Sequence, residues 1–158
     1  METLAIDPGP TESGWVIWDG TRVVQSGVSD NDFVLAWLLH QARGKLLAIE
    51  MIRSYGMSVG ASVFETCVWV GRFQQIGIMT GKRVILCYRP DVKIHHCKSP
   101  KAKDGNVRQA LIDRIGEPGT KKNPGGTYGV KSHAWAALAV AVYARDLEDA
   151  RAAGVVPF

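Results

Sequence analysis

Two apolar segments of this chain each end in an acidic residue, and this arrangement limits the folds that the sequence can form. Residues 4–6 (Leu-Ala-Ile) run into Asp7 and a Pro-Gly turn, and residues 46–49 (Leu-Leu-Ala-Ile) run into Glu50. A short apolar run bounded by turn residues is typical of a buried strand. If the two strands are neighbours, both carboxylates lie at one edge of the sheet, and hard oxygen ligands of this kind suit Mg²⁺ or Mn²⁺. The alternative is that Asp7 only begins the turn and Glu50 is an ordinary surface acid.

The composition fits one soluble domain. A chain of 158 residues, with 46% hydrophobic and 22% charged residues, can bury a core of its own, so we expect residues 1–158 to form a single domain. The sequence shows neither a signal peptide nor an apolar run of membrane-spanning length. The three cysteines lack metal-site spacing. These observations predict a reduced, intracellular protein in the cytoplasm.

The net charge of +4 is concentrated in two basic segments. Residues 98–103 read Lys-Ser-Pro-Lys-Ala-Lys, and a loop rich in glycine and proline contains Lys121 and Lys122. Basic loops favour binding of a polyanion such as nucleic acid. A solvated surface without a partner is the alternative.

The order of the predicted elements indicates an α/β fold with a mixed sheet. The Asp-Gly pair at 19–20 predicts a hairpin between two early strands, so the chain should begin with an antiparallel meander of three strands. Apolar spacing and turn residues place the elements as follows: strands at 3–7, 13–18 and 22–28, a helix at 31–43, a strand ending at Glu50, a helix at 59–80, a strand at 84–88, loop or short helix at 90–103, and helices at 104–115 and 130–152.

The predicted helix at 59–80 has apolar and aromatic residues around much of its circumference. A helix that is apolar on more than one side is often shared between the core of its own subunit and a partner subunit. We therefore expect this helix to form a subunit interface.

Three motifs together resemble the RuvC-type Holliday junction resolvases of the RNase H/retroviral-integrase superfamily, and a phage or prophage branch in particular. The motifs are Ala5-Ile6-Asp7-Pro8-Gly9 with Gly14-Trp15 downstream, Ala48-Ile49-Glu50, and His133-Ala134-Trp135-Ala136-Ala137-Leu138-Ala139 in the last helix. They follow the order and spacing of that family across nearly the whole chain. The resemblance implies an RNase H-like five-stranded mixed sheet, with three antiparallel strands followed by two parallel ones, flanked by helices. It also implies a bacterial or phage-infected host cell.

The resemblance assigns a metal site to three residues. It implies that Asp7 bridges two Mg²⁺ or Mn²⁺ ions, that Glu50 is a further ligand, and that His133 binds through a neutral imidazole nitrogen. Two such ions about 4 Å apart would activate a water and stabilise the leaving oxygen of a phosphodiester. The products implied are nicks with 5′-phosphate and 3′-hydroxyl ends.

Position 136 departs from the family pattern. The last helix of the family usually has an Asp three residues after the first ligand, and here that position is Ala136, which cannot bind a metal. Either an Asp→Ala change was introduced to inactivate the protein, or the natural protein has alanine and relies on Asp7, Glu50 and His133, helped by Asp104. Asp104 could instead simply cap the helix that follows it.

The implied substrate is branched DNA, above all the four-way junction, cut by an isologous homodimer joined through the helix at 59–80. The loop after Glu50 resembles the family's junction-probing loop, in which Tyr55 would stack on a base and Arg53 would contact a phosphate. For Tyr55 the alternative is a loop-packing role. Further candidate phosphate contacts are Lys98, Lys101, Lys103, Arg108, Lys121 and Lys122.

Three other functions compete with this prediction. The first is a nuclease of the same fold that cuts branched DNA generally, or RNA. The second is a protein that binds junctions or other branched DNA without cutting, because no acid is present at Ala136. The third is an ATP-binding domain of the actin and sugar-kinase type, which also has an Asp-Gly theme in its opening strands. This chain is too short for the second, repeated half that such a domain needs.

Overall fold

The computed structural model describes residues 1–42 and 44–155, and at its centre lies a five-stranded sheet with the strand order β3-β2-β1-β4-β5. The strands are β1 (Thr3–Asp7), β2 (Glu12–Trp18), β3 (Val23–Asp30), β4 (Leu46–Met51) and β5 (Arg83–Tyr88). β2 pairs antiparallel with β1 and with β3, whereas β4 runs parallel to both β1 and β5. The predicted RNase H-like mixed sheet, three antiparallel strands followed by two parallel ones, is confirmed.

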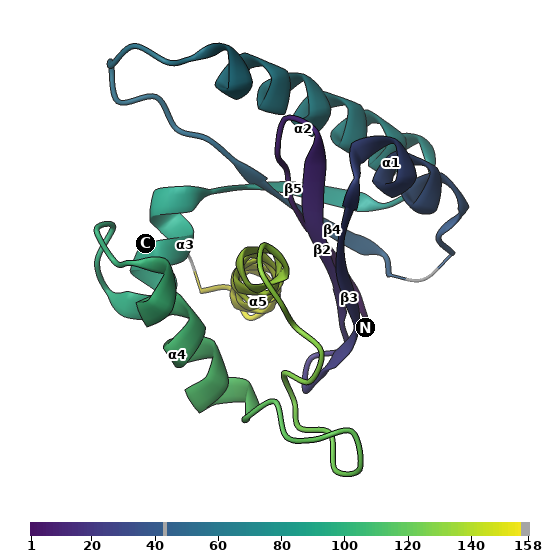
Figure 1. Ribbon diagram of the computed structural model, residues 1–158, viewed down its shortest axis with the longest axis vertical. Helices are drawn as coiled ribbons and strands as arrows, with labels where there is room; N and C mark the ends of the chain where they lie inside the picture. The colour runs from purple at the N-terminus through teal and green to yellow at the C-terminus, as the bar shows by residue number, and fades with distance from the viewer. Residues whose placement is uncertain (43, 156–158) are drawn as a thin grey trace.

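Helices cover both faces of this sheet (Figure 1). The helices are α1 (Asn31–His40), α2 (Ala61–Met79), α3 (Arg89–Cys97), α4 (Asp104–Ile115) and α5 (Ala134–Ala152). α1 and α2 pack on one face, and α5 packs on the other, with α3 and α4 outside it. α5 therefore lies in the interior, between the sheet and two other helices.

On β1 the two faces of the sheet bury residues of different size. On β1, Leu4 and Ile6 face the cluster formed with α1 and α2, whereas Ala5 faces the cluster formed with α5. Ala48 on β4 also faces α5. The small side chains of Ala5 and Ala48 let α5 approach these two central strands closely, which matches the many alanines of the helix itself. Because strands buried on both faces lack polar alternation, β1 and β4 appear in the sequence as continuous apolar runs.

Two helix ends differ from the prediction by three residues or more, and a segment left open between loop and short helix proves to be partly helical. The segment predicted as loop or short helix at 90–103 begins with the nine-residue helix α3, which has Pro90 in its first turn, where proline is tolerated. The last helix was expected from residue 130 but begins at Ala134, because Ser132 has a left-handed backbone (φ 48°) that no α-helix can include. The first helix was expected to reach residue 43 but ends at His40, and Arg43 itself lies outside the described residues.

No helix within residues 1–42 and 44–155 has both the length and the apolar character that a membrane crossing requires.

Candidate active site

Asp7 and Glu50 lie side by side at one edge of the sheet. β1 and β4 are parallel neighbours with Ile6 opposite Ile49, so the next residue on each strand emerges at the same edge. Both acids are buried, and Asp7 is only 6% exposed. The expectation that the two strands are adjacent and bring these carboxylates together agrees with the structure.

Burial and mutual repulsion make this pair a poor place for two negative charges. Burial, then the hydrogen bond between Asp7 and Glu50, and then the charge of Glu50 raise the pKa of Asp7 to about 9, from 3.8. The charge of a nearby arginine opposes this rise without cancelling it. The pair therefore has too little positive charge around it in the metal-free protein.

That arginine is Arg89, which the sequence analysis did not identify. Its Nε donates a hydrogen bond to Oε1 of Glu50 (3.2 Å) and its Nη2 donates one to Oε2 (2.9 Å). The same Nη2 lies 3.9 Å from Oδ1 of Asp7. These hydrogen bonds and the charge of Glu50 raise the pKa of Arg89 above its usual value. A signal was present in the sequence, because Arg89 directly follows the apolar run of β5, the parallel neighbour of β4.

His133 approaches the pair from the start of α5. Its Nδ1 lies 3.4 Å from Oδ2 of Asp7, and the residue is the N-cap of the helix. Asp7 is paired across the sheet with Gly14, and a Cβ at Gly14 would overlap the carbonyl oxygen of His133. Glycine is required at this position because the start of α5 touches the backbone of β2. This contact explains why Gly14 forms part of the first motif.

A cavity of about 280 Å³ opens beside the acid pair. Asp7, Glu50, His133, Ala136 and Asp104 all line it, so the structure brings together five of the predicted positions. Ala136 is one helical turn beyond His133 and faces the cavity, as the family pattern implies for the residue at this position. Asp104 is the first residue of α4 and Lys103 is the N-cap, so the predicted capping role of Asp104 is wrong.

Besides Arg89, two cationic side chains line this cavity, Lys93 from α3 and Arg108 from α4. Arg108 was predicted as a phosphate contact, and its guanidinium lies over the ring of Trp135 at 4.7 Å from the centroid. Lys93 was not predicted. A cavity with acids on one side and cations on the other can hold a phosphodiester next to a metal ion.

The side chains at the sheet edge suit a hard divalent cation, although they offer few ligands. A cation between the two carboxylates would stabilise the ionised form of Asp7, whose pKa is raised, and His133 could add a nitrogen ligand. Among the described residues, no group of three or more His, Cys, Asp or Glu side chains is close enough together to hold a metal ion. A cation bound here would therefore take its remaining ligands from water or from a phosphate.

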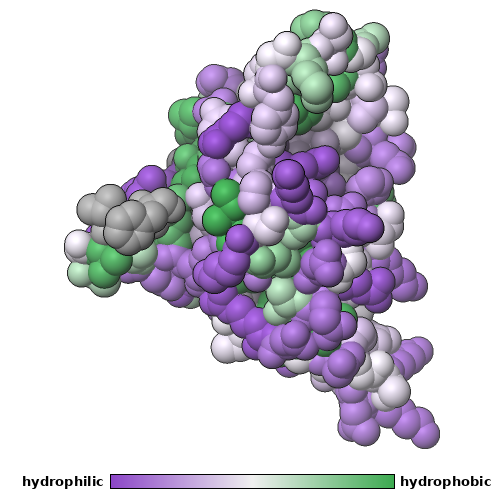
Figure 2. Space-filling model, turned by 90° about the vertical axis from the view of Figure 1, so that its left-hand side faces the viewer, coloured by the Kyte–Doolittle hydropathy of each residue, from purple (hydrophilic) through white to green (hydrophobic). Residues whose placement is uncertain are grey.

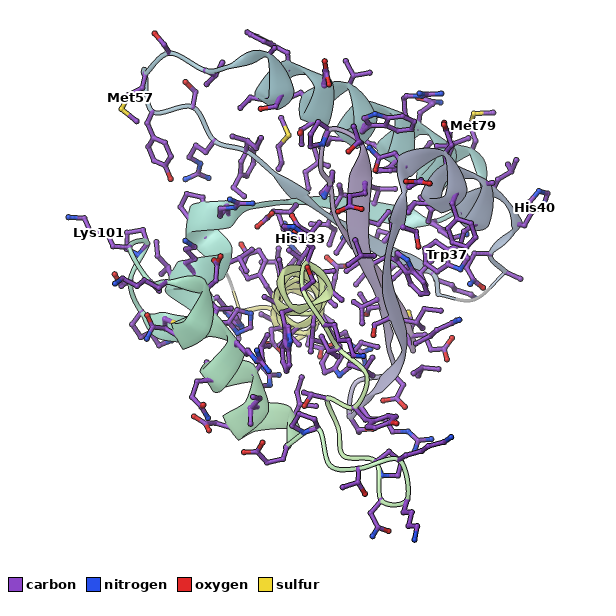
Figure 3. The ribbon with its side chains drawn as sticks, in the orientation of Figure 1. Trp37, His40, Met57, Met79, Lys101 and His133 are labelled. Carbon is purple, nitrogen blue, oxygen red and sulfur yellow. The ribbon has the colours of Figure 1, made fainter. Side chains whose placement is uncertain are left out.

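The other predicted DNA contacts do not lie at the cavity. Arg53 forms an ion pair with Asp91 (2.7 Å) and lies over the ring of Tyr88. Tyr55 is exposed in the segment between β4 and α2. Met57 of this segment and Lys101 lie on the same side of the molecule, well away from His133 (Figure 3). The remaining lysines are exposed: Lys98, Lys101 and Lys103 follow α3, and Lys121 and Lys122 lie in the loop between α4 and α5.

The face that includes Met57 and Lys101 is mainly hydrophilic, with small hydrophobic areas between the polar ones (Figure 2). Such a surface suits a hydrated, charged partner better than an apolar one.

Comparison with known proteins gives no match to any family model and none to a curated protein sequence. Among solved structures, Thermus thermophilus RuvC aligns over 100% of both chains with a TM-score of 0.71 and 21% identity. This chain has the RuvC fold. The RuvC of the same organism in complex with a Holliday junction substrate aligns over 100% of this chain and 99% of that one, with a TM-score of 0.72 and 18% identity. The RuvC fold thus accounts for the whole chain, α3 and α4 included.

Proposed function

We propose that this protein is a metal-dependent endonuclease that resolves four-way DNA junctions, and that residues 1–158 are one nuclease domain. The observation that carries the proposal is the buried pair Asp7 and Glu50 at the ends of adjacent parallel strands, in a chain whose RuvC fold extends from end to end. The RuvC structure solved with a Holliday junction supports branched DNA as the substrate class.

The residues around the cavity have separate roles in this reaction. Asp7 and Glu50 would hold the cation, Mg²⁺ or Mn²⁺, with His133 as a third ligand. When bound, such a cation supplies Lewis-acid activation of water and offsets the charge of the scissile phosphate. Lys93 and Arg108 attract the phosphate into the cavity and orient it. The exposed side chain of Tyr55 is available to stack on an unpaired base at the branch point.

The lysines outside the cavity would contact DNA further from the cut. Lys98, Lys101, Lys103, Lys121 and Lys122 are exposed, so they can meet the arms of a branched substrate. Arg53 could reach a phosphate only by giving up Asp91. Since the substrate is cellular or phage DNA, we expect the protein to act in the cytoplasm of a bacterium or an infected host. A phage or prophage origin follows from the motif resemblance alone.

A second function, junction binding without cleavage, has one specific observation in its favour. Ala136 faces the cavity at a place where a carboxylate would complete the ligand set. If two acids and a histidine hold the cation too weakly, the protein would bind branched DNA and leave it intact.

Cleavage of a synthetic four-way junction in Mg²⁺ or Mn²⁺ tests the proposal. We expect paired nicks at symmetric positions in two strands, with 5′-phosphate ends, and no cutting of a linear duplex of the same sequence. Equal cutting of three-way and flap DNA would instead indicate a general branched-DNA nuclease. Salt-dependent binding with no nicks would favour the non-catalytic alternative.

Symmetric nicking requires a dimer, which we place at α2. The inner side of this helix buries Val70 and Phe73 against the sheet, while Phe64 and Val68 are 64% and 61% exposed one turn apart. Neighbouring exposed apolar residues on one helix are typical of a subunit interface.

We therefore expect Phe64→Glu to weaken the homodimer by about 30-fold or more, since a buried aromatic contact at an interface is worth about 2 kcal/mol or more. Sedimentation equilibrium would show the change in mass. The two nicks in a junction should then occur independently. The matched control is Phe33→Glu, which changes an exposed phenylalanine on α1 and should leave the dimer intact. A protein that is monomeric without any substitution would contradict this assignment.

A further inference from the structure

We propose that Arg89 is a displaceable internal counter-ion, which lies between Asp7 and Glu50 in the metal-free protein and leaves when a divalent ion binds. The inference rests on the proposed function, because it concerns how that metal site is loaded. It assigns a role to a residue that neither the motifs nor the resemblance identified.

The contacts of Arg89 put a positive charge where a metal ion would carry one. Both oxygens of Glu50 accept hydrogen bonds from the guanidinium, at 3.2 and 2.9 Å, and Oδ1 of Asp7 lies 3.9 Å from the same Nη2. A cation bridging the two carboxylates needs an oxygen from each of them. Arg89 and the metal ion therefore compete for Glu50.

The two partners differ in exposure, which makes the arginine the mobile one. The side chain of Arg89 is 56% exposed, whereas those of Glu50 and Asp7 are 9% and 6% exposed. The guanidinium can thus move into solvent by rotating its own side chain, while the acids stay fixed in the sheet. Arg89, Lys93 and Arg108 all line the cavity, so a released Arg89 can remain beside the other two cations and face a phosphate.

The pair of Arg89 with Glu50 differs from a second arginine–glutamate pair in the described residues. At the opposite end of β5, both Nε and Nη2 of Arg83 contact the carboxylate of Glu148, with 2.6 Å between Nε and Oε2. Glu148 on α5 is 15% exposed, pairs with Arg151 as well as Arg83, and does not line the cavity. Arg89 instead serves an acid pair that is closed off from water, where a counter-charge is needed until a metal ion supplies it.

A fixed role for Arg89 makes the opposite prediction. If the arginine only holds Glu50 in position for the metal, its removal should disorder a ligand and weaken metal binding. If it is a competitor, its removal should strengthen binding. The sign of the change in metal affinity separates the two roles.

The test is calorimetric titration of the dimeric, DNA-free protein with Mn²⁺ at one fixed pH. We expect Arg89→Met to bind Mn²⁺ about tenfold more tightly than the unchanged protein, because two charge-assisted hydrogen bonds no longer have to break. Arg89→Lys, which keeps the charge but loses the fork, should show a smaller gain. Arg83→Met removes the equivalent surface contact and should not alter the affinity. Asp7→Asn should abolish the binding and so identifies the site.

Thermal melting supplies a second readout that does not depend on cleavage. In EDTA, Arg89→Met should melt below the unchanged protein, because Glu50 has lost its partner, and saturating Mn²⁺ should close the gap. The inference is overturned if the unchanged protein binds Mn²⁺ through Asp7 and Arg89→Met binds it equally well or more weakly. That result leaves the nuclease proposal standing. If Arg89→Met binds Mn²⁺ more tightly but the unchanged protein does not cut DNA, the inference is supported and the proposed function fails. If neither the unchanged protein nor Arg89→Met binds Mn²⁺ more tightly than Asp7→Asn does, both the inference and the proposed function are overturned.

Discussion

Asp7→Asn should abolish junction cleavage and, at the same time, make the metal-free protein more stable at neutral pH. Loss of cutting should be at least about 1,000-fold, since a residue that acts as part of one catalytic unit takes most of the rate with it. The gain in stability should be about 1–3 kcal/mol, because the folded protein must keep Asp7 protonated at neutral pH, where the free side chain is ionised, and an amide removes this cost. The same residue that the reaction needs therefore destabilises the protein that lacks metal.

The pH dependence of unfolding checks the physical reason. The pKa of Asp7 is about 9 in the folded protein against 3.8 for the free side chain. Between pH 3.8 and about 9, the folded protein therefore holds a proton on Asp7 that the unfolded chain has lost. The stabilisation from this proton is fully present below about pH 4 and is lost as the pH rises towards 9. Urea unfolding in EDTA should show this decline for the unchanged protein and a flatter curve for Asp7→Asn.

Asp32→Asn is the matched control for this prediction. Asp32 is an exposed acid in the first turn of α1, remote from the cavity, and its replacement should change neither the cleavage rate nor the pH profile. Added Mg²⁺ should stabilise the unchanged protein and the control but not Asp7→Asn. An Asp7→Asn protein that still cuts junctions would falsify the assignment of the metal site.

Ala136→Asp should raise the affinity for Mg²⁺ or Mn²⁺ by about tenfold or more and increase the cleavage rate. Ala136 faces the cavity one helical turn from His133, so a carboxylate there would meet the same cation as Asp7 and Glu50. In EDTA the variant should be less stable by about 1–2 kcal/mol, since a third acid joins a pair that already repels. Metal titration, cleavage and unfolding in EDTA measure the three effects.

The matched control is Ala152→Asp, at the exposed far end of the same helix, which should alter neither metal affinity, nor cleavage, nor stability in EDTA.

The outcomes separate the explanations for the alanine. If only Ala136→Asp cuts, the alanine accounts for a lost activity. If the unchanged protein cuts and the variant gains little, two acids and His133 suffice. If neither cuts and both bind junctions, the protein is a DNA-binding member of the fold. An unchanged metal affinity would show that position 136 does not reach the cation.

The strands and the acid pair could be predicted because their signals are local. A buried strand appears as a continuous apolar run, and an acid at its end is visible without knowing which strand lies next to it. The parallel pairing of β1 with β4 then followed from the family resemblance and agrees with the register of Ile6 and Ile49.

Arg89 and Lys93 could not be predicted in the same way, because their roles depend on contacts between distant segments. Arg89 bonds to a residue 39 positions earlier in the chain. Charge density in the sequence does not give the distance of a lysine from the site, and the lysines at 98–103 and 121–122 lie outside the cavity, so their contacts with DNA stay a prediction. The sequence leaves the segment at 90–103 open between loop and short helix, and Pro90 stands in the first turn of α3, where it has no hydrogen bond to lose.

The interior position of α5 determines when during synthesis the protein can become active. The helix fills the space between the sheet and α3 and α4, and its first turn contributes His133 next to Asp7. A nascent chain that has produced only the strands holds Asp7 and Glu50 but lacks the helix that packs beneath them. The site can therefore assemble only after residues 134–152 have left the ribosome. If the protein cuts DNA as proposed, unfinished chains would carry the acids of a nuclease without its activity, and the DNA of the cell that makes them would be protected.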